Sequence, residues 1–161
     1  TKKNSISPCR DSTMAIDRGD VDIKRALKTA YNILAYADNT EAKLRRKLAE
    51  RDYEADIIDE VVETVRASGA LDEERMLVSK LNYLINTKKY GRRRVAADLR
   101  KLGFSRELVE SVDWDDFDFI AACASQIKSR GGLDDKTFAA LLRRGYLVSE
   151  IKAAAKIVDE E

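Results

Sequence analysis

Apolar residues recur every three to four positions along most of the chain, which is the period of an amphipathic helix. The first clear stripe begins near Ile23 and contains Leu27, Ala30, Tyr31 and Leu34. The period returns in eight later segments, of which the clearest span residues 57–65, 77–85, 91–102, 134–144 and 148–158. Only seven glycines and one proline interrupt the chain, so turn residues are too few for many short strands. The pattern therefore predicts nine helices.

Three sets of anchor residues indicate that these helices form a repeat. In each set a leucine lies five residues before an aromatic residue, and a β-branched residue lies five residues after it. The sets are Leu48, Tyr53 and Ile58; Leu99, Phe104 and Val109; and Leu141, Tyr146 and Ile151. The residue before each aromatic is Asp52, Gly103 or Gly145, where we expect a helix to end and the chain to turn. We expect the anchors themselves to be core residues.

Repeats of this kind bury their apolar faces partly against their neighbours, so a row of them gives an extended molecule. We therefore predict an all-α fold of three tandem three-helix repeats that form an elongated, curved molecule. The predicted repeats span residues 23–70, 71–113 and 114–161. Residues 1–22 are polar and lack the helical period, so we expect them to form a loosely packed N-terminal arm.

The composition narrows the choice of function. Charged residues make up 37% of the 161 residues, which favours a large exposed surface. The formal net charge is only +1, so the chain as a whole has no strong attraction for nucleic acid. Two cysteines and no histidine suit a reduced, cytoplasmic setting. No apolar run approaches the roughly 20 residues of a membrane span, and we expect no membrane partner.

The sequence lacks the motifs of the common enzyme classes. It has no glycine-rich phosphate loop, no ligand spacing typical of zinc and no Ser/His/Asp set. Its carboxylates are numerous but are distributed as on ordinary helix surfaces, without an isolated pair in an apolar setting. We therefore expect a binding protein that has no catalytic residues, metal or cofactor.

Four segments, in their order along the chain, resemble the RecX family. They are EAKLRRKL at 41–48, GALDEER at 69–75, YGRRRV at 90–95 followed by DLRKLGF at 98–104, and LLRRGY at 141–146. The resemblance covers roughly residues 26–156. The chain departs from the family pattern at Asp52, where glycine is usual, and at Arg92, where proline is frequent.

The resemblance implies a regulator that binds RecA filaments on DNA, lies in their helical groove, and suppresses ATP hydrolysis, strand exchange and co-protease activity. Such a protein modulates recombination, DNA repair and the SOS response. RecX-like proteins are non-enzymatic, and some also bind DNA, so single- or double-stranded DNA is a further candidate partner. We expect a monomer, because the sequence has no heptad seam.

Basic residues gather at the second helix of each predicted repeat or at its entry. The clusters are Lys43, Arg45, Arg46, Lys47 and Arg51; then Lys88, Lys89, Arg92, Arg93, Arg94, Arg100 and Lys101; and finally Arg143 and Arg144. Between residues 88 and 101 seven positive charges accompany one negative charge, that of Asp98. Arginine suits bidentate contact with carboxylates or phosphates. We predict that these residues, except Arg51 and together with Tyr90, contact RecA or DNA.

Other interpretations of these features stay open. The first and third clusters also fit a solvated helix face that neighbouring carboxylates balance. A DNA-binding module would fit three-helix units with short turns, and a scaffold for another protein would fit the repeat alone. Trp114 either packs between the second and third repeats or is an exposed contact. Cys123 is predicted to be a small core residue, and Cys9 has no predicted partner.

Overall fold

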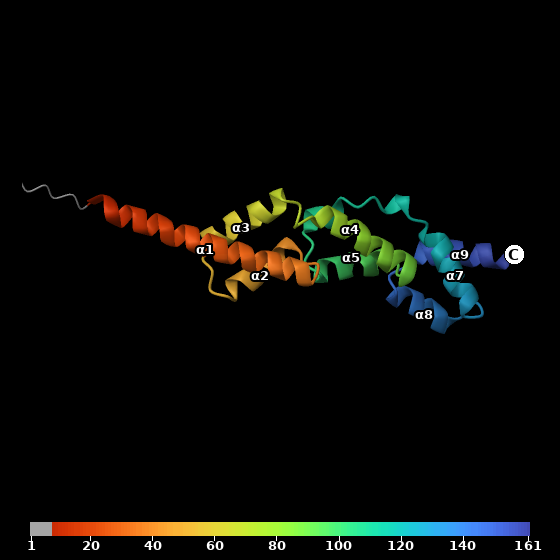
Figure 1. Ribbon diagram of the computed structural model, residues 1–161. Coiled ribbons are helices and arrows are strands. Elements are labelled where there is room, and N and C mark those ends of the chain that lie inside the picture. Colours follow the sequence, from red (N-terminus) through yellow and green to blue (C-terminus); the bar gives the residue numbers. More distant parts are fainter. Residues whose placement is uncertain (1–7) are drawn as a thin grey trace, which may run out of the picture. The chain divides into compact units, whose positions relative to one another are not determined.

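The computed structural model describes the backbone of residues 8–161 and the side chains of residues 19–161 (Figure 1). Over this part of the chain every regular element is a helix or a helical turn, so the predicted all-α class is confirmed. The chain divides into two compact units between Asp72 and Glu73. Within the described residues no helix has the length and apolar character needed to cross a membrane.

The first unit contains α1 (Pro8–Tyr36), α2 (Glu41–Ala49) and α3 (Ala55–Ala67). Helix α1 packs against both α2 and α3 (Figure 1). Thr40 caps α2, because its hydroxyl accepts a hydrogen bond from the N–H of Lys43 (3.4 Å). The apolar stripes of the three helices enclose one core, which consists of Ala26, Ala30, Leu44, Leu48, Ile58, Val61, Val62, Val65 and Leu71.

Helix α1 begins at Pro8, whereas the sequence predicted a loosely packed arm up to residue 22. Proline fits the first turn of a helix, because its missing N–H would have no helical acceptor there. Gly19 weakens a helix by roughly 1 kcal/mol relative to alanine, which is too little to end it. Helix α1 therefore includes residues 8–22, where the sequence indicated no helix, because a missing apolar period is not a stop signal; the loose packing of this segment stays a prediction. The side chain of Cys9 lies outside the described residues.

The second unit contains the remaining elements. They are α4 (Glu73–Asn82), the π-helical turn η1 (Tyr83–Thr87), α5 (Arg92–Lys101), α6 (Arg106–Glu110), the 3-10 turn η2 (Trp114–Asp116), α7 (Phe119–Ser129), α8 (Asp135–Arg143) and α9 (Val148–Asp159). They share a single core, and Phe119, Cys123 and Tyr146 are almost completely buried in it. The half-buried ring of Trp114 packs against this core, with its centroid 6.2 Å from that of Phe119. The packing interpretation of Trp114 is therefore favoured.

The three predicted anchors form the same turn. At each one the N–H of the aromatic residue donates to the carbonyl of the leucine five residues earlier, at 3.4, 3.2 and 3.2 Å in chain order. This bond belongs to the Schellman motif, which requires a left-handed residue just before the aromatic. Asp52, Gly103 and Gly145 have φ values of 63°, 99° and 98°. The predicted turns are confirmed, and the five-residue spacing is that of a helix-ending hydrogen bond.

The separate repeats at 71–113 and 114–161 stay a prediction, because these two segments share one core.

Candidate partner-binding surface

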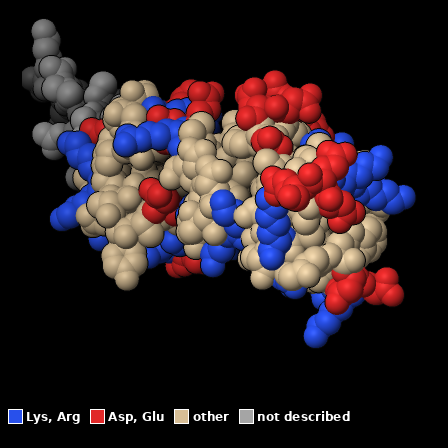
Figure 2. All heavy atoms as spheres, turned by 90° about the vertical axis from the view of Figure 1, so that its right-hand side faces the viewer, with Lys and Arg blue, Asp and Glu red and all other residues tan. Residues whose placement is uncertain are grey.

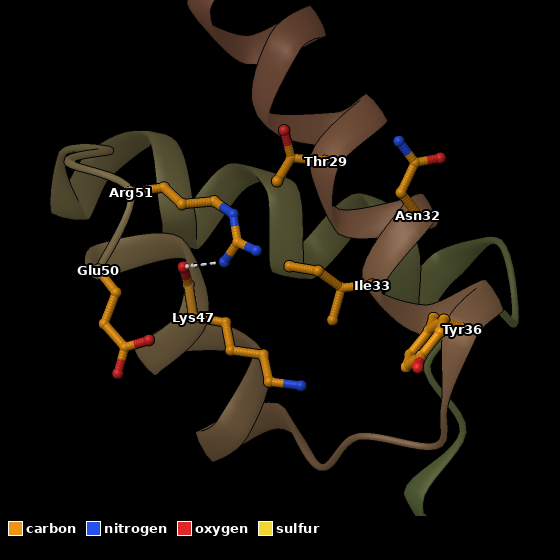
Figure 3. Close-up of a pocket in the computed structure, with 7 residues that line it drawn as sticks. All are labelled: Thr29, Asn32, Ile33, Tyr36, Lys47, Glu50 and Arg51. Carbon is orange, nitrogen blue, oxygen red and sulfur yellow. Dashed lines mark hydrogen bonds between the residues drawn. The ribbon is translucent and has the colours of Figure 1, made fainter.

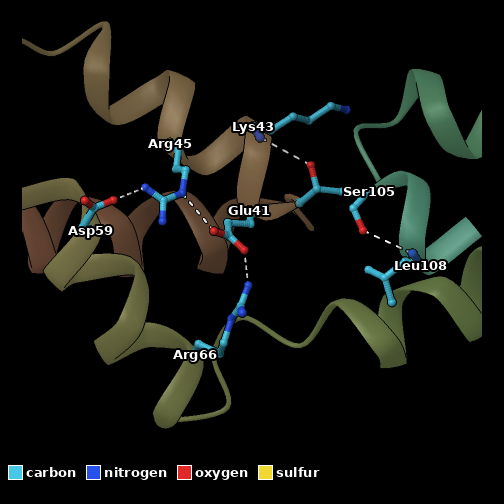
Figure 4. A network of polar contacts seen from close by, with 8 residues as sticks. Glu41, Lys43, Arg45, Asp59, Arg66, Ser105 and Leu108 are labelled. Carbon is cyan, nitrogen blue, oxygen red and sulfur yellow. Dashed lines mark hydrogen bonds and ion pairs between the residues drawn. The ribbon is translucent and has the colours of Figure 1, made fainter. Parts of the chain in front are cut away.

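The first basic cluster is largely paired with carboxylates and amides inside its own unit. Arg45 bridges Glu41, at 2.9 Å, and Asp59, which ties α2 to α3 (Figure 4). Arg66 of α3 also contacts Glu41. The hydrogen bond that Arg45 donates to Asp59 raises the pKa of Arg45 against the lowering effect of burial, and the hydrogen bond to Glu41 and its charge raise this pKa further.

The other cations of α2 have weaker or partial internal contacts. Arg46 lies 3.6 Å from Glu50, and the Lys47 ammonium donates to the side-chain oxygen of Asn39 at 2.7 Å. Lys43 is half-buried at the start of the helix. The solvated-face interpretation of this cluster therefore has a concrete basis, whereas a role in partner contact stays a prediction.

In the second unit, two glycines allow the start of α5 to lie directly on the turn between α8 and α9. The N–H of Gly91 donates to the carbonyl of Arg144 (2.8 Å), and the N–H of Arg93 donates to the carbonyl of Gly145 (3.1 Å). A Cβ atom at Gly91 would lie 2.3 Å from the backbone of Gly145, and one at Gly145 would lie 2.3 Å from the N atom of Arg94. Only glycine fits this contact, which we call the glycine joint.

A buried ion pair supports the glycine joint on one side. Arg92 Nε lies 2.8 Å from Glu150 Oε1, and the Glu150 side chain is only 6% exposed. The other Glu150 oxygen accepts a hydrogen bond from the N–H of Leu147 (3.4 Å) at the start of α9. The Arg92 guanidinium also lies 5.1 Å from the ring centre of Phe119. Arg92 therefore connects α5 to α7 and α9.

Tyr90 supports the joint on another side. The guanidinium carbons of Arg94 and Arg144 lie 4.6 and 5.1 Å from the centre of its ring. Arg94 also pairs with Asp98 at 3.2 Å, and Arg144 donates a hydrogen bond to the carbonyl of Lys88. Tyr90, Arg94 and Arg144, which the sequence predicted to contact a partner, thus contact other residues of their own unit.

The chain before α5 is shaped to supply acceptors for these contacts. In η1 the N–H of Lys88 donates to the carbonyl of Tyr83 (3.0 Å), a π-helical bond, and Lys89 then takes a φ of 57°. The carbonyl of Lys89 accepts a hydrogen bond from the Tyr146 hydroxyl (2.7 Å). Burial raises the pKa of Tyr146 to about 12, so this hydroxyl stays a donor.

The outward face of α5 carries the basic residues of this helix that form no ion pair. Val95 and Leu99 are fully buried, and Arg93, Arg100 and Lys101 are exposed on the opposite side. Arg93 and Arg100 are seven residues apart, which is two helical turns or roughly 10 Å along one face. Within the described residues these three side chains have no carboxylate partner. We call them the α5 stripe.

The remaining predicted contact residues lie near the glycine joint or on α8. Lys88 is exposed, with its ammonium 5.7 Å from the ring centre of Tyr83, and Lys89 is half-buried. Arg143, at the end of α8, is exposed. Blue basic and red acidic groups both reach the face drawn in Figure 2, and in several places they lie side by side.

Sequence reasoning missed two features of this region. The partner of Arg92 is Glu150, which lies far along the chain, so a count of charges between residues 88 and 101 did not include it. Glu150 lies three residues after the N-cap Leu147 and accepts a hydrogen bond from the Leu147 N–H, but leucine has no side-chain acceptor, so no complete capping box marked this position in the sequence. The close contact between Gly91 and Gly145 had no sequence signal beyond the glycines themselves.

Taken together, the recurring turn and the α5 stripe define an all-helical protein in which the same helix-ending turn occurs three times and one helix carries an exposed basic face. Comparison with known proteins identifies its family. Residues 26–64 match the family model described as RecX, first three-helix domain. The chain is 31% identical over 147 residues to the regulatory protein RecX of Escherichia coli (strain SE11), which covers 80% of this chain and 88% of that protein. The chain belongs to the RecX family of regulatory proteins.

A more divergent relative and two solved structures agree with this assignment. The regulatory protein RecX of Pelodictyon phaeoclathratiforme is 26% identical over 142 residues, covering 83% of this chain and 88% of that protein. The crystal structure of RecX from Lactobacillus salivarius matches 88% of this chain and 99% of its own, with a TM-score of 0.78 and 20% identity. A second crystal structure of regulatory protein RecX has a TM-score of 0.74 and 15% identity, covering 100% of this chain and 80% of its own. These two likenesses establish the fold.

Proposed function

We propose that this chain binds RecA nucleoprotein filaments and lowers their ATPase, strand-exchange and co-protease activities, and so regulates DNA repair and the SOS response. Membership of the RecX family carries this proposal. A regulator of this kind acts by binding, and the residues that the sequence singled out are, apart from Tyr90, basic side chains on helices, at a helix end or in the segment before α5.

The α5 stripe is the proposed contact with the filament. Its three cations are exposed on one helix face, whereas Arg92 and Arg94 already have carboxylate partners within the unit. A cation without an ion pair can bind a partner without losing an existing contact, whereas a paired cation must first give up its internal contact. Acidic side chains of RecA or phosphates of the bound DNA would complement the stripe.

Hydrolysis of ATP by RecA on single-stranded DNA tests the proposed function. We expect inhibition when this chain is added at concentrations below that of RecA from the same organism, because each bound molecule then affects several filament subunits. Circular dichroism confirms that the added protein is folded. Unchanged hydrolysis at equimolar concentration of folded protein would contradict the proposal.

A DNA-binding module is the second candidate, since the stripe would also suit phosphates. Binding to DNA alone should then weaken steeply as salt rises, in proportion to the number of phosphates contacted. Fluorescence anisotropy with labelled single- and double-stranded DNA, in the absence of RecA, distinguishes the two candidates. Tight, salt-sensitive binding without an effect on RecA would favour the DNA-binding module.

A further inference from the structure

The first unit contains a hollow of about 480 Å³ between α1 and the end of α2. Its lining consists of Thr29, Asn32, Ile33 and Tyr36 from α1, and Lys47, Glu50 and Arg51 from α2 and the turn after it. The volume is within the range of sites that hold a small ligand or a few side chains. The proposed function makes no use of this region apart from Lys47.

Two cations and an apolar wall face the same space. In Figure 3 the Arg51 guanidinium and the Ile33 side chain point toward one another across the hollow. The Lys47 ammonium extends from α2 along the Ile33 side of the hollow, and it also donates a hydrogen bond to the side-chain oxygen of Asn39 (2.7 Å). Arg51 is held in place by a hydrogen bond from Nη1 to the carbonyl of Lys47 (2.9 Å). A guanidinium has five N–H donors, so this single bond leaves most of them available to a ligand.

Tyr36 gives the hollow an exposed aromatic rim. Its side chain is 93% exposed, the most of any large apolar residue among the described side chains. Free proteins bury most aromatic surface, because each aromatic side chain gains substantially from leaving water. An uncovered ring beside two cations is therefore suited to a ligand that has both an apolar and an anionic part.

The charge around the hollow favours a protein carboxylate over a nucleic acid. The first unit, residues 1–72, contains fourteen acidic and thirteen basic residues, so the hollow is a local positive site on a unit with almost no net charge. A nucleic acid presents a row of phosphates and needs an extended basic track. Glu50 belongs to the lining, but it pairs with Arg46 at 3.6 Å, and in Figure 3 its carboxylate points away from Tyr36. A single carboxylate fits this pattern.

We infer that the hollow binds a segment of a partner protein in which an aspartate or glutamate adjoins a large apolar side chain. The carboxylate lies between Lys47 and Arg51, and the apolar side chain packs on Ile33 and Tyr36. This contact gives the first unit its own recognition surface, separate from the α5 stripe. It rests on the proposed function only in requiring that a protein partner exists.

Nuclear magnetic resonance on the full, isotope-labelled chain tests the inference. The probe is the peptide N-acetyl-Leu-Asp-Leu-amide, and the matched control peptide has Asn in place of Asp. We expect saturable shifts of the Ile33 methyl and the Arg51 amide signals with the Asp peptide. The control peptide should bind about tenfold more weakly, because a hydrogen bond to a charged group is lost. Shifts that are equal for both peptides would overturn the carboxylate assignment.

Variants separate the hollow from non-specific attraction. Tyr36→Ala removes an exposed ring at little cost to folding, and Arg51→Gln removes one of the two cations. Each substitution should weaken binding of the Asp peptide several-fold. Arg130→Gln removes an exposed charge from the other unit and should leave binding unchanged. Shifts with tetrathymidylate but not with the peptide, or no shifts at the hollow with either, would overturn the inference.

RecA hydrolysis assays on the same variants keep the two proposals distinct. Inhibition of RecA without peptide binding at the hollow would overturn this inference alone. Peptide binding at the hollow without any effect on RecA would overturn the proposed function alone.

Discussion

Among the three turns that end the second helices, the first has aspartate where the other two have glycine. Asp52 holds a left-handed φ of 63° that an L-residue adopts at a cost of roughly 1–2 kcal/mol. Glycine removes that cost but adds freedom to the unfolded chain, which returns part of the gain. The Asp52→Gly variant should therefore have a free energy of unfolding higher by about 0.5 kcal/mol, measured by urea denaturation.

A matched glycine substitution tests whether the backbone angle is the cause. Glu63→Gly lies in the middle of α3, where glycine should lower the free energy of unfolding by about 1 kcal/mol. If both variants were destabilised equally, the left-handed backbone angle at Asp52 would not lower the stability of the natural chain as proposed.

Cys123 gives the second unit a predictable response to alkali. Burial, followed by the nearby charge of Glu150, raises the pKa of this thiol from 9.0 to about 11. Between these values the folded protein holds a proton that the unfolded chain releases, so the thiol's contribution to stability is present below pH 9 and is lost by pH 11. Urea denaturation should show a steeper fall of stability over this range for the natural chain than for Cys123→Ala. Identical slopes would contradict the raised pKa.

At the scale of elements, the ion pair between α5 and α9 gives Arg92 a structural role that the exposed Arg93 does not have. Arg92→Ala should lower the free energy of unfolding by about 2–3 kcal/mol, because Glu150 stays buried without its partner. Arg93→Ala should change it by less than about 0.5 kcal/mol, since that side chain is exposed. Urea denaturation of both variants checks the difference.

A second substitution tests the cause of that loss. Adding Glu150→Gln to Arg92→Ala removes the stranded charge and should restore part of the stability. Equal stability of Arg92→Ala and Arg93→Ala would mean that the ion pair does not support the glycine joint.

The sequence predicted those elements whose signals are local. The helix-ending turns follow from a fixed spacing of leucine and aromatic residues. The start of α1 was missed because a helix needs no apolar period to continue. The π-helical turn η1 was missed because its residues fit an α-helical stripe equally well, and Leu84 and Ile85 are buried in either form.

For the whole molecule, the sequence located the basic segments but not the role of each side chain. Arg92, Arg93 and Arg94 are consecutive and chemically identical. Only the three-dimensional structure shows that the first meets Glu150, the third meets Tyr90 and Asp98, and the second faces outward. Such contacts depend on partners far along the chain, which a local count of charges does not contain. Membership of the family could be predicted from the sequence because it rests on several ordered segments and not on any one side chain.

The most direct test of the α5 stripe compares two triple variants as inhibitors of RecA-catalysed ATP hydrolysis on single-stranded DNA. One variant carries Arg93→Gln, Arg100→Gln and Lys101→Gln; the other carries Arg130→Gln, Lys152→Gln and Lys156→Gln, which removes the same charge from other exposed positions. The stripe variant should need about tenfold more protein for half-inhibition, with a smaller difference at high salt. The control variant should match the natural chain. Equal inhibition by both variants would contradict the account.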